Sequence, residues 1–300
     1  MIHERIKKLR SKFNLLKIDG YIIPKNDEFF SEYSSKDRLR IISNFSGSAG
    51  YAIILKRKNY LFVDGRYTLQ AKIESGKLFH ITKFEKIFNC KLFNNLTLGI
   101  DPKLFTSQQI NRFFKKKTFI KEIEHNLVDS IYNKYSLLHT KPFFSLDKKI
   151  VGENHIKKIK KVCLFLKNNK MDYLFISAPE NVAWLLNIRG FDNPYSPIPN
   201  CRLLINKNGK FVLISNLIKL RKLIKEKKLK KKNIVELNNF QVFINRLKNK
   251  KIIIDNISCS LYYENLFKKK AKVFLKEDPI YLLKSIKNKT EINNMINSHI

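Results

Sequence analysis

The spacing of apolar residues predicts a helix followed by a short strand near the start of the chain. Between Ile2 and Leu16, apolar side chains recur every three or four residues, which places them on one face of a helix. The run from Asp19 to Pro24 is nearly all apolar and ends at a proline, as expected of a short buried strand. The same order returns about 150 residues later, with a helix predicted over 156–167 and a strand over 172–179.

Each half of the chain continues with two strand-like runs joined by a turn. In the first half the runs are 51–55 and 60–63, with basic residues between them. In the second half they are 202–205 and 211–214, joined by Asn206-Lys207-Asn208-Gly209. Asparagine followed by glycine between two β-rich runs is typical of a hairpin, because both residues accept a positive φ at little cost. The repeated order predicts an α/β fold of two related modules, each a mixed β-sheet packed with helices.

Interruptions of these patterns divide the chain into three parts. Thr140-Lys141-Pro142 separates the two halves, so we expect domains over 1–145 and 146–277. Asp278-Pro279 marks a second boundary, and we expect 278–300 to begin a further domain.

The last predicted helix carries an apolar stripe. It is predicted to open at Thr290, with Glu291 in its first turn. The stripe consists of Ile292, Met295, Ile296 and His299. No glycine, proline or basic last turn closes this helix, so we expect its apolar face to meet a partner domain. The alternative is that the helix packs back on the second module.

Composition excludes several classes of protein. Sixty Lys and Arg against 25 Asp and Glu give a net charge of +35, but 44% hydrophobic residues are too many for a disordered polycation. The longest apolar runs are far shorter than the roughly 18 residues of a membrane span, and the first residues do not resemble a signal peptide. The cysteines, which lack the spacing of a zinc site or a disulfide framework, are Cys90, Cys163, Cys201 and Cys259. These features predict a cytoplasmic protein without a membrane partner.

The positive charge raises nucleic-acid binding as an alternative, because clustered Lys and Arg release counterions from phosphates. The lysine runs lie at 115–117, 227–232 and 268–270. They are scattered along the chain and mostly lack interleaved aromatic residues. Solvated faces explain them better, so specific nucleic-acid binding is not expected.

Catalytic patterns are scarce in this sequence. The histidines, which show no HxxxH or HxH pairing, are at positions 3, 80, 125, 139, 155 and 299. The small-residue segment 46–50 fits no nucleophile or phosphate-loop motif, and it is interpreted as a loop that needs close packing. Asp64-Gly65-Arg66-Tyr67 follows a predicted strand, and its aspartate is expected to cap a helix running from Tyr67 to Glu74.

Several segments taken together resemble a known family. In the first half they are 26–28, 31–33, 38–50 and 63–71, with 100–102 and 126–129 as further landmarks. In the second half they are 179–190, followed by Asp192, Pro194, Tyr195 and Pro197. These segments are similar to the creatinase-type amino-terminal domains of Xaa-Pro aminopeptidases. The resemblance favours the long form of that family, in which two such modules precede a metallopeptidase domain of pita-bread fold.

The resemblance implies a function for the complete enzyme and a different one for this chain. The complete enzyme releases the residue before a penultimate proline, using two divalent metal ions, expected to be manganese, held by its third domain. No metal ligand or catalytic residue of that domain transfers to a position here. We therefore expect this chain to bind no metal, to be inactive alone, and to serve assembly and substrate gating. Its expected partners are a second copy of itself and a catalytic domain or companion chain.

The candidate gating or interface residues are Asp64, Arg66, Tyr67, Phe45, Trp184 and Arg189. For Arg66 the alternative is an internal ion pair that only fixes the turn. Two other functions remain open for the whole chain: a free-standing pseudoenzyme that acts as an interaction module, and a basic nucleic-acid-binding protein.

Overall fold

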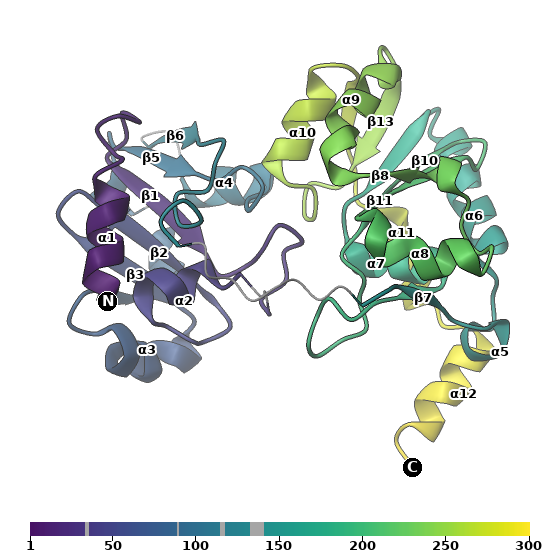
Figure 1. The fold of residues 1–300 in the computed structure, drawn as a ribbon, viewed down its shortest axis with the longest axis horizontal. Coiled ribbons are helices and arrows are strands. Elements are labelled where there is room, and N and C mark those ends of the chain that lie inside the picture. The colour runs from purple at the N-terminus through teal and green to yellow at the C-terminus, as the bar shows by residue number, and fades with distance from the viewer. Residues whose placement is uncertain (34–35, 89, 115–117, 133–140) are drawn as a thin grey trace. The chain divides into compact units, whose positions relative to one another are not determined.

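The computed structural model describes residues 1–33, 36–88, 90–114, 118–132 and 141–300, which fall into two compact units, 1–137 and 138–300 (Figure 1). Each unit builds a β-sheet of its own. The predicted α/β fold of two modules is confirmed.

Among its described residues, the first unit forms a six-stranded mixed sheet in the order β4-β3-β2-β1-β5-β6. Its strands are β1 (Gly20–Pro24), β2 (Gly50–Leu55), β3 (Asn59–Val63), β4 (His80–Lys83), β5 (Thr97–Ile100) and β6 (Phe119–Glu122). Its helices are α1 (Ile2–Arg10), α2 (Arg38–Ser43), α3 (Thr68–Ser75) and α4 (Ser107–Phe113). The strands β1, β2 and β3 pair antiparallel, and the outer pairs are parallel. All five residues of β1 are buried, which explains why its sequence is apolar throughout.

The second unit repeats this topology strand for strand, in the order β12-β11-β10-β8-β13-β14. These strands are β8 (Tyr173–Ile176), β10 (Arg202–Asn206), β11 (Phe211–Ile214), β12 (Ile234–Val235), β13 (Lys251–Ile254) and β14 (Lys272–Leu275). Its helices are α5 (Lys148–Val151), α6 (His155–Asn168), α7 (Pro179–Leu186), α8 (Leu217–Lys225), α9 (Phe240–Ile244), α10 (Leu261–Lys268), α11 (Pro279–Ser285) and α12 (Lys289–Asn297). Gly209 adopts a φ of +81° in the predicted hairpin turn between β10 and β11. The second unit also contains a separate two-stranded antiparallel sheet, formed by β7 (Phe144–Ser145) and β9 (Ile188–Arg189).

The repeat extends to individual hydrogen bonds. Asp19, just before β1, accepts from the Nζ of Lys56 at 2.8 Å and from the backbone N–H of Thr97 at 2.9 Å. Asp172, just before β8, accepts from the Nζ of Lys207 at 2.9 Å and from the backbone N–H of Lys251 at 3.0 Å. Each aspartate thereby ties the start of its central strand to a hairpin and to the neighbouring parallel strand. Because these bonds favour the charged carboxylate, the pKa of both aspartates lies below its usual value.

The first helix ends earlier than its apolar spacing predicts. The α-helical hydrogen bonding stops at Arg10, and residues 11–17 continue as tight turns. Lys17 closes these turns at a φ of +49°, and the N–H of Ile18 then bonds to the carbonyl of Phe13. Phe13 remains buried, so the apolar spacing predicted the packing correctly although it did not predict where the helix ends.

Helix α12 begins at Lys289, one residue before the predicted start. Its N-cap is Asn288, which forms a capping box with Glu291. The Nδ2 atoms of Asn288 and Asn294 bond to the backbone of the α5 region, at the carbonyls of Val151 and Ile150. The predicted apolar stripe is about half exposed at Ile292, Met295 and Ile296, while His299 lies beyond the helix.

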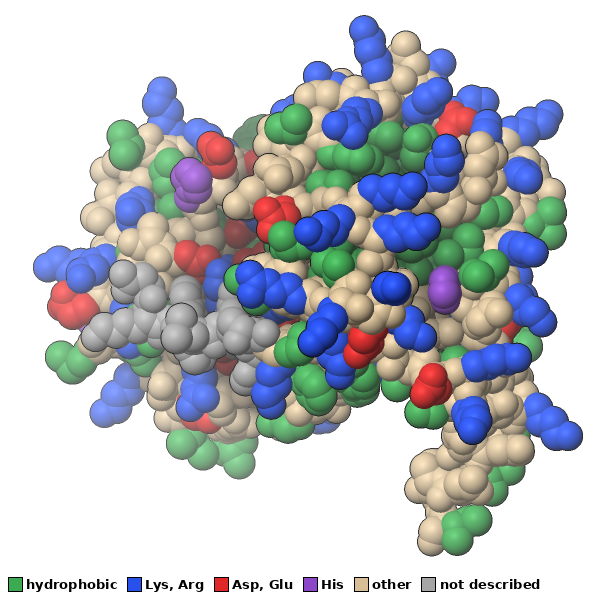
Figure 2. All heavy atoms as spheres, turned by 45° about the vertical axis from the view of Figure 1, so that its right-hand side comes forward, with side chains coloured by type: hydrophobic (Ala, Val, Ile, Leu, Met, Phe, Trp, Pro, Cys, Tyr) green, Lys and Arg blue, Asp and Glu red, His purple; other side chains and the backbone are tan. Residues whose placement is uncertain are grey.

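Lysine and arginine side chains are spread over the face shown in Figure 2, with apolar and neutral residues between them. Among the described residues, no helix has both the length and the apolar character that crossing a membrane requires.

Candidate functional site

The turn that follows β3 presents Arg66 to solvent. Asp64 accepts hydrogen bonds from the backbone N–H of Arg66 at 3.0 Å and from its Nε at 2.9 Å. The Arg66 side chain is 72% exposed and that of Asp64 is 41% exposed. The hydrogen bond from Arg66 holds the pKa of the Asp64 carboxyl below its usual range. Both features considered for Arg66, an ion pair within the turn and an accessible guanidinium, are therefore present together.

The aspartate caps a short 3-10 turn, Gly65–Tyr67, which leads into α3, and so does not cap α3 directly. Tyr67 lies behind this turn, with its hydroxyl 2.9 Å from the Oγ of Ser48. Its ring meets the edge of Phe45, with 5.9 Å between ring centroids. Phe45 is completely buried, so its ring supports the turn from within and presents no surface.

The small-residue loop 46–50 is held against α3 by a carboxylate that the sequence patterns do not single out. Glu74 accepts from the backbone N–H of Ser46 at 2.7 Å and from its Oγ at 2.6 Å. Desolvation acts to raise the pKa of Glu74, but these hydrogen bonds together outweigh it and hold the pKa below its usual value. A Cβ on Gly47 would overlap the ring of Phe45, which explains the small residue there. The loop is thus a packed structural element.

A buried ion-pair cluster is centred on Arg38 in the first unit. The Arg38 side chain is only 1% exposed, and it donates from Nε and Nη2 to the two carboxylate oxygens of Asp129 at 2.7 and 2.8 Å. Its Nη2 also donates to Glu28 at 2.6 Å. Burial opposes ionisation of Glu28, but the adjacent guanidinium outweighs it and lowers the pKa of that carboxyl. The segments 26–28, 38–50 and 126–129 therefore meet at one arginine.

Asp101, which directly follows β5, is hydrogen-bonded to the segment 126–129. Asp101 accepts from the Nδ2 of Asn126 at 2.9 Å, and both residues are buried. Burial raises the pKa of Asp101 despite this hydrogen bond. The bond fixes the segment 126–129 that carries Asp129, so it positions the partner of Arg38.

In the second unit, Trp184 lies at the centre of another polar cluster. The Nζ of Lys158 stands 4.1 Å from the centroid of the Trp184 ring and donates to the Trp184 carbonyl at 3.0 Å. The Trp184 Nε1 donates to Glu291 of α12 at 3.3 Å. Burial lowers the pKa of Lys158 to about 8, against the opposing attraction of Glu291 and Glu153.

Arg189, the second residue of β9, also contacts helix α7. Its Nη1 donates to the backbone carbonyls of Ala183 at 3.2 Å and Ile188 at 2.9 Å. Burial lowers its pKa, while the charge of Glu291 acts in the opposite direction. Trp184 thus contacts the first turn of α12 through Glu291, and the charge of Arg189 acts on the same carboxylate. The six predicted site residues fall into two groups, one in each unit.

The described residues do not offer a metal-ligand set. No three His, Cys, Asp or Glu side chains in this part of the chain gather closely enough to hold a metal ion. The donor groups of these described residues therefore do not fit a dinuclear metal centre.

Both units match models of known protein families. Two family models, each described as the creatinase/prolidase N-terminal domain, match residues 5–123 and 136–291. This chain belongs to the creatinase/prolidase N-terminal domain family. The second match extends beyond 277, through α11 and into the first turn of α12.

Known proteins similar to this chain include Xaa-Pro aminopeptidases. The chain is 29% identical over 326 residues to Xaa-Pro aminopeptidase 1 of Dictyostelium discoideum, an alignment covering 100% of this chain and 51% of that protein. It is 28% identical to a probable Xaa-Pro aminopeptidase P of Laccaria bicolor, covering 99% and 49% of the two chains. The chain thus spans about half the length of these relatives.

A solved structure shares the whole fold. X-prolyl aminopeptidase from Caenorhabditis elegans superposes with a TM-score of 0.87 at 24% identity, covering 100% of this chain and 54% of the other. That protein is described as a cytosolic enzyme with a di-nuclear active site.

Proposed function

We propose that the two units form the non-catalytic amino-terminal portion of an Xaa-Pro aminopeptidase, in which they serve assembly and substrate access. The observation that carries this proposal is that two creatinase/prolidase N-terminal matches together span most of the chain. The relatives aligned along its whole length are Xaa-Pro aminopeptidases of about twice its span.

The proposed roles follow from what each unit presents. In the first unit Arg66 offers an exposed guanidinium on a turn that Asp64, Tyr67 and Phe45 hold in place. A guanidinium fixed in this way can orient a peptide carbonyl or carboxylate at the mouth of an active site. In the second unit Trp184 donates a hydrogen bond to Glu291 in the first turn of α12, so it would help to orient that helix. Arg189 would act on the same carboxylate through its charge.

Two divalent ions, expected to be manganese, would belong to the catalytic portion, and the substrate would be a peptide with proline in second position. We also propose a cytoplasmic location, which the isolated cysteines support and which matches the description of the C. elegans relative. We also propose that the chain forms a homo-oligomer through its first unit.

The test measures release of the first residue from an Ala-Pro-Phe peptide by the purified chain, with and without manganese. No release is expected from the chain alone, because several convergent carboxylates are needed to hold two divalent ions. The remaining half of the D. discoideum relative, added as a separate chain, is expected to bind this one and to show a lower KM in its presence.

Three outcomes oppose the proposal. Release activity that follows the chain through several chromatographic columns would show that it is catalytic itself. Failure to bind the catalytic half would favour a free-standing interaction module. Retention on immobilised nucleic acid that survives physiological salt would favour the basic nucleic-acid-binding function.

A further inference from the structure

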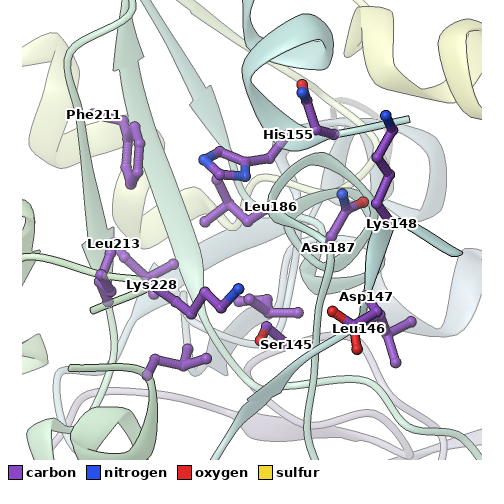
Figure 3. A pocket seen from close by; sticks show the side chains of 14 residues that line it. Ser145, Leu146, Asp147, Lys148, His155, Leu186, Asn187, Phe211, Leu213 and Lys228 are labelled. Carbon is purple, nitrogen blue, oxygen red and sulfur yellow. The ribbon is translucent and has the colours of Figure 1, made fainter. Parts of the chain in front are cut away.

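The second unit contains a cavity of about 270 Å³ that the proposed function does not use (Figure 3). One wall is the segment 145–148, which begins in β7, and the opposite wall comes from β11 and the end of α8. The start of α6 and the end of α7 close it between these walls. The cavity therefore lies within a single unit.

This cavity depends on the β7 and β9 pair, which the described sheet of the first unit lacks. The pair holds segment 145–148 in place, and the N–H of Leu146 bonds to the carbonyl of Asn187 at 2.9 Å. The side chain of Asn187 is itself fixed, since it accepts from the Nζ of Lys158 at 2.8 Å and donates to the carbonyl of Glu153 at 2.9 Å. A cavity whose walls are held by such bonds is pre-formed, which lowers the entropy lost on binding.

The walls of the cavity are mostly apolar. The side chains that form them include Leu186, Ile188, Phe211, Leu213 and Leu229. An engineered apolar cavity of about 150 Å³ accommodates benzene, and sites for drug-sized ligands begin near 300 Å³. A volume of about 270 Å³ therefore suits one ring or a branched chain with a short polar arm.

The polar groups around the cavity favour a negative charge on that arm. Lys148 and Lys228 both line it, and neither forms an ion pair within the part of the chain that the structure describes. Asp147 is the single carboxylate among the lining residues. Figure 3 shows the Lys228 side chain extending toward Ser145, while the imidazole of His155 lies beside Leu186. Burial lowers the pKa of His155, and the charges of Lys228 and Lys158 lower it further, so the local potential is positive.

We propose that this cavity binds a small apolar monocarboxylate of about the size of a single-ring or branched-chain acid. Its carboxylate meets Lys228, and its apolar body lies against Phe211 and Leu213. The ammonium group supplies a charge-assisted hydrogen bond, and the apolar walls supply the hydrophobic part of the affinity.

The test uses 3-phenylpropionate as the probe and the neutral 3-phenylpropanol as its matched control. Calorimetry is expected to give a dissociation constant for the acid on the order of 0.1 to 1 mM. The alcohol should bind at least about tenfold more weakly, because it cannot pair with an ammonium group. A bound carboxylate should also raise the pKa of His155, which NMR of its imidazole protons follows directly. Failure of the acid to bind, or equal binding of the acid and the alcohol, would overturn the proposal.

Two substitutions locate the binding. Lys228→Met keeps the aliphatic length and removes the charge, and it should weaken binding of the acid by about tenfold or more. Lys225→Met is the control, because Lys225 is exposed in the last turn of α8 and does not line the cavity. Leu146→Trp should fill the cavity and abolish binding, since Leu146 is only half-buried and a larger side chain can enter the space. Unchanged affinity in Lys228→Met would refute the assignment even if Leu146→Trp failed to fold.

Discussion

Replacement of Arg38 with methionine is expected to destabilise the first unit by about 3 kcal/mol. Removal of one partner from a buried ion pair typically costs 3–5 kcal/mol, because the remaining charges stay desolvated. The Arg38 side chain is 1% exposed, but those of Glu28 and Asp129 are 29% and 30% exposed. Solvent therefore screens part of the repulsion between the two carboxylates, which places the expected loss at the lower end of that range.

Methionine is chosen because it fills a similar space without a charge, so the loss reports the ion pair rather than a cavity. The control is Arg40→Met on the same helix. Arg40 is exposed, and no ion pair of its guanidinium occurs among the described residues. The control should change stability by less than about 0.5 kcal/mol.

Amide hydrogen exchange measures the first unit separately from the second. The amides of β1 and β5 should exchange more than about 100-fold faster in Arg38→Met, since each 1.4 kcal/mol corresponds to a factor of ten. The amides of β8, in the second unit, serve as an internal reference and should exchange at the wild-type rate. Exchange in β1 within about threefold of wild type would refute the reasoning, because it would show that the cluster adds little to stability.

The dependence on pH gives a second measure of the same cluster. Burial opposes ionisation of Glu28, yet Arg38 lowers the pKa of this carboxyl in the folded state below its usual 4.5. A lowered pKa gives stability that is present above the unfolded pKa and is lost as pH falls through the folded pKa. The difference between wild type and Arg38→Met should therefore be full at neutral pH and shrink below pH 4.5. A difference that stays constant from neutral to acidic pH would contradict this assignment.

Three further predictions concern the candidate site and the second unit. In an enzyme reconstituted with a catalytic portion, Arg66→Lys should raise KM for short Xaa-Pro peptides and leave the melting temperature unchanged, since Arg66 is exposed. The fluorescence of Trp184, the single tryptophan of the chain, should titrate near pH 8 as Lys158 loses its charge beside the ring, and the titration should vanish in Lys158→Met. Burial raises the pKa of Asp278 to about 6, so the folded state binds this proton more tightly than the unfolded state. Stability from this group should therefore increase as pH falls from about 6 toward 3.8, and urea titrations should show that Asp278→Asn lacks this increase.

Each of these predictions has a result that would contradict it. Early unfolding of Arg66→Lys with an unchanged KM would show that Arg66 only fixes the turn. A tryptophan titration that persists in Lys158→Met would assign the change to another group. Parallel stability curves of wild type and Asp278→Asn between pH 7 and 4 would show that burial of Asp278 does not bias its protonation.

The sequence by itself determined the central strand and the hairpin of each half, and the internal repeat of this protein. The runs 19–24 and 172–179 are short, apolar and bounded by turn residues, and both contain central strands of matching sheets. The second strand is shorter than predicted, since β8 ends at Ile176 and Pro179 begins α7. These predictions succeeded because they depend on neighbouring residues: the φ of Gly209 is set within a four-residue turn. The capping role of Asp64 was predicted correctly but for the wrong element, since Asp64 caps the 3-10 turn that precedes α3. The ion pair of Arg66 within the turn was also open to prediction, because its partner Asp64 lies only two residues away in the sequence.

Only the tertiary structure decided the partners of the buried charges. Arg38 and Asp129 are 91 residues apart, and Lys158 meets a tryptophan carbonyl 26 residues away. Apolar spacing gives no information about such pairs, because a charged residue on a helix is ordinarily expected to face water. The cavity beside Lys228 also depends on the pairing of β7 with β9, whose two strands are too short to give a pattern. Contacts between segments distant in sequence arise only when the sheets assemble, so local residue order cannot specify them.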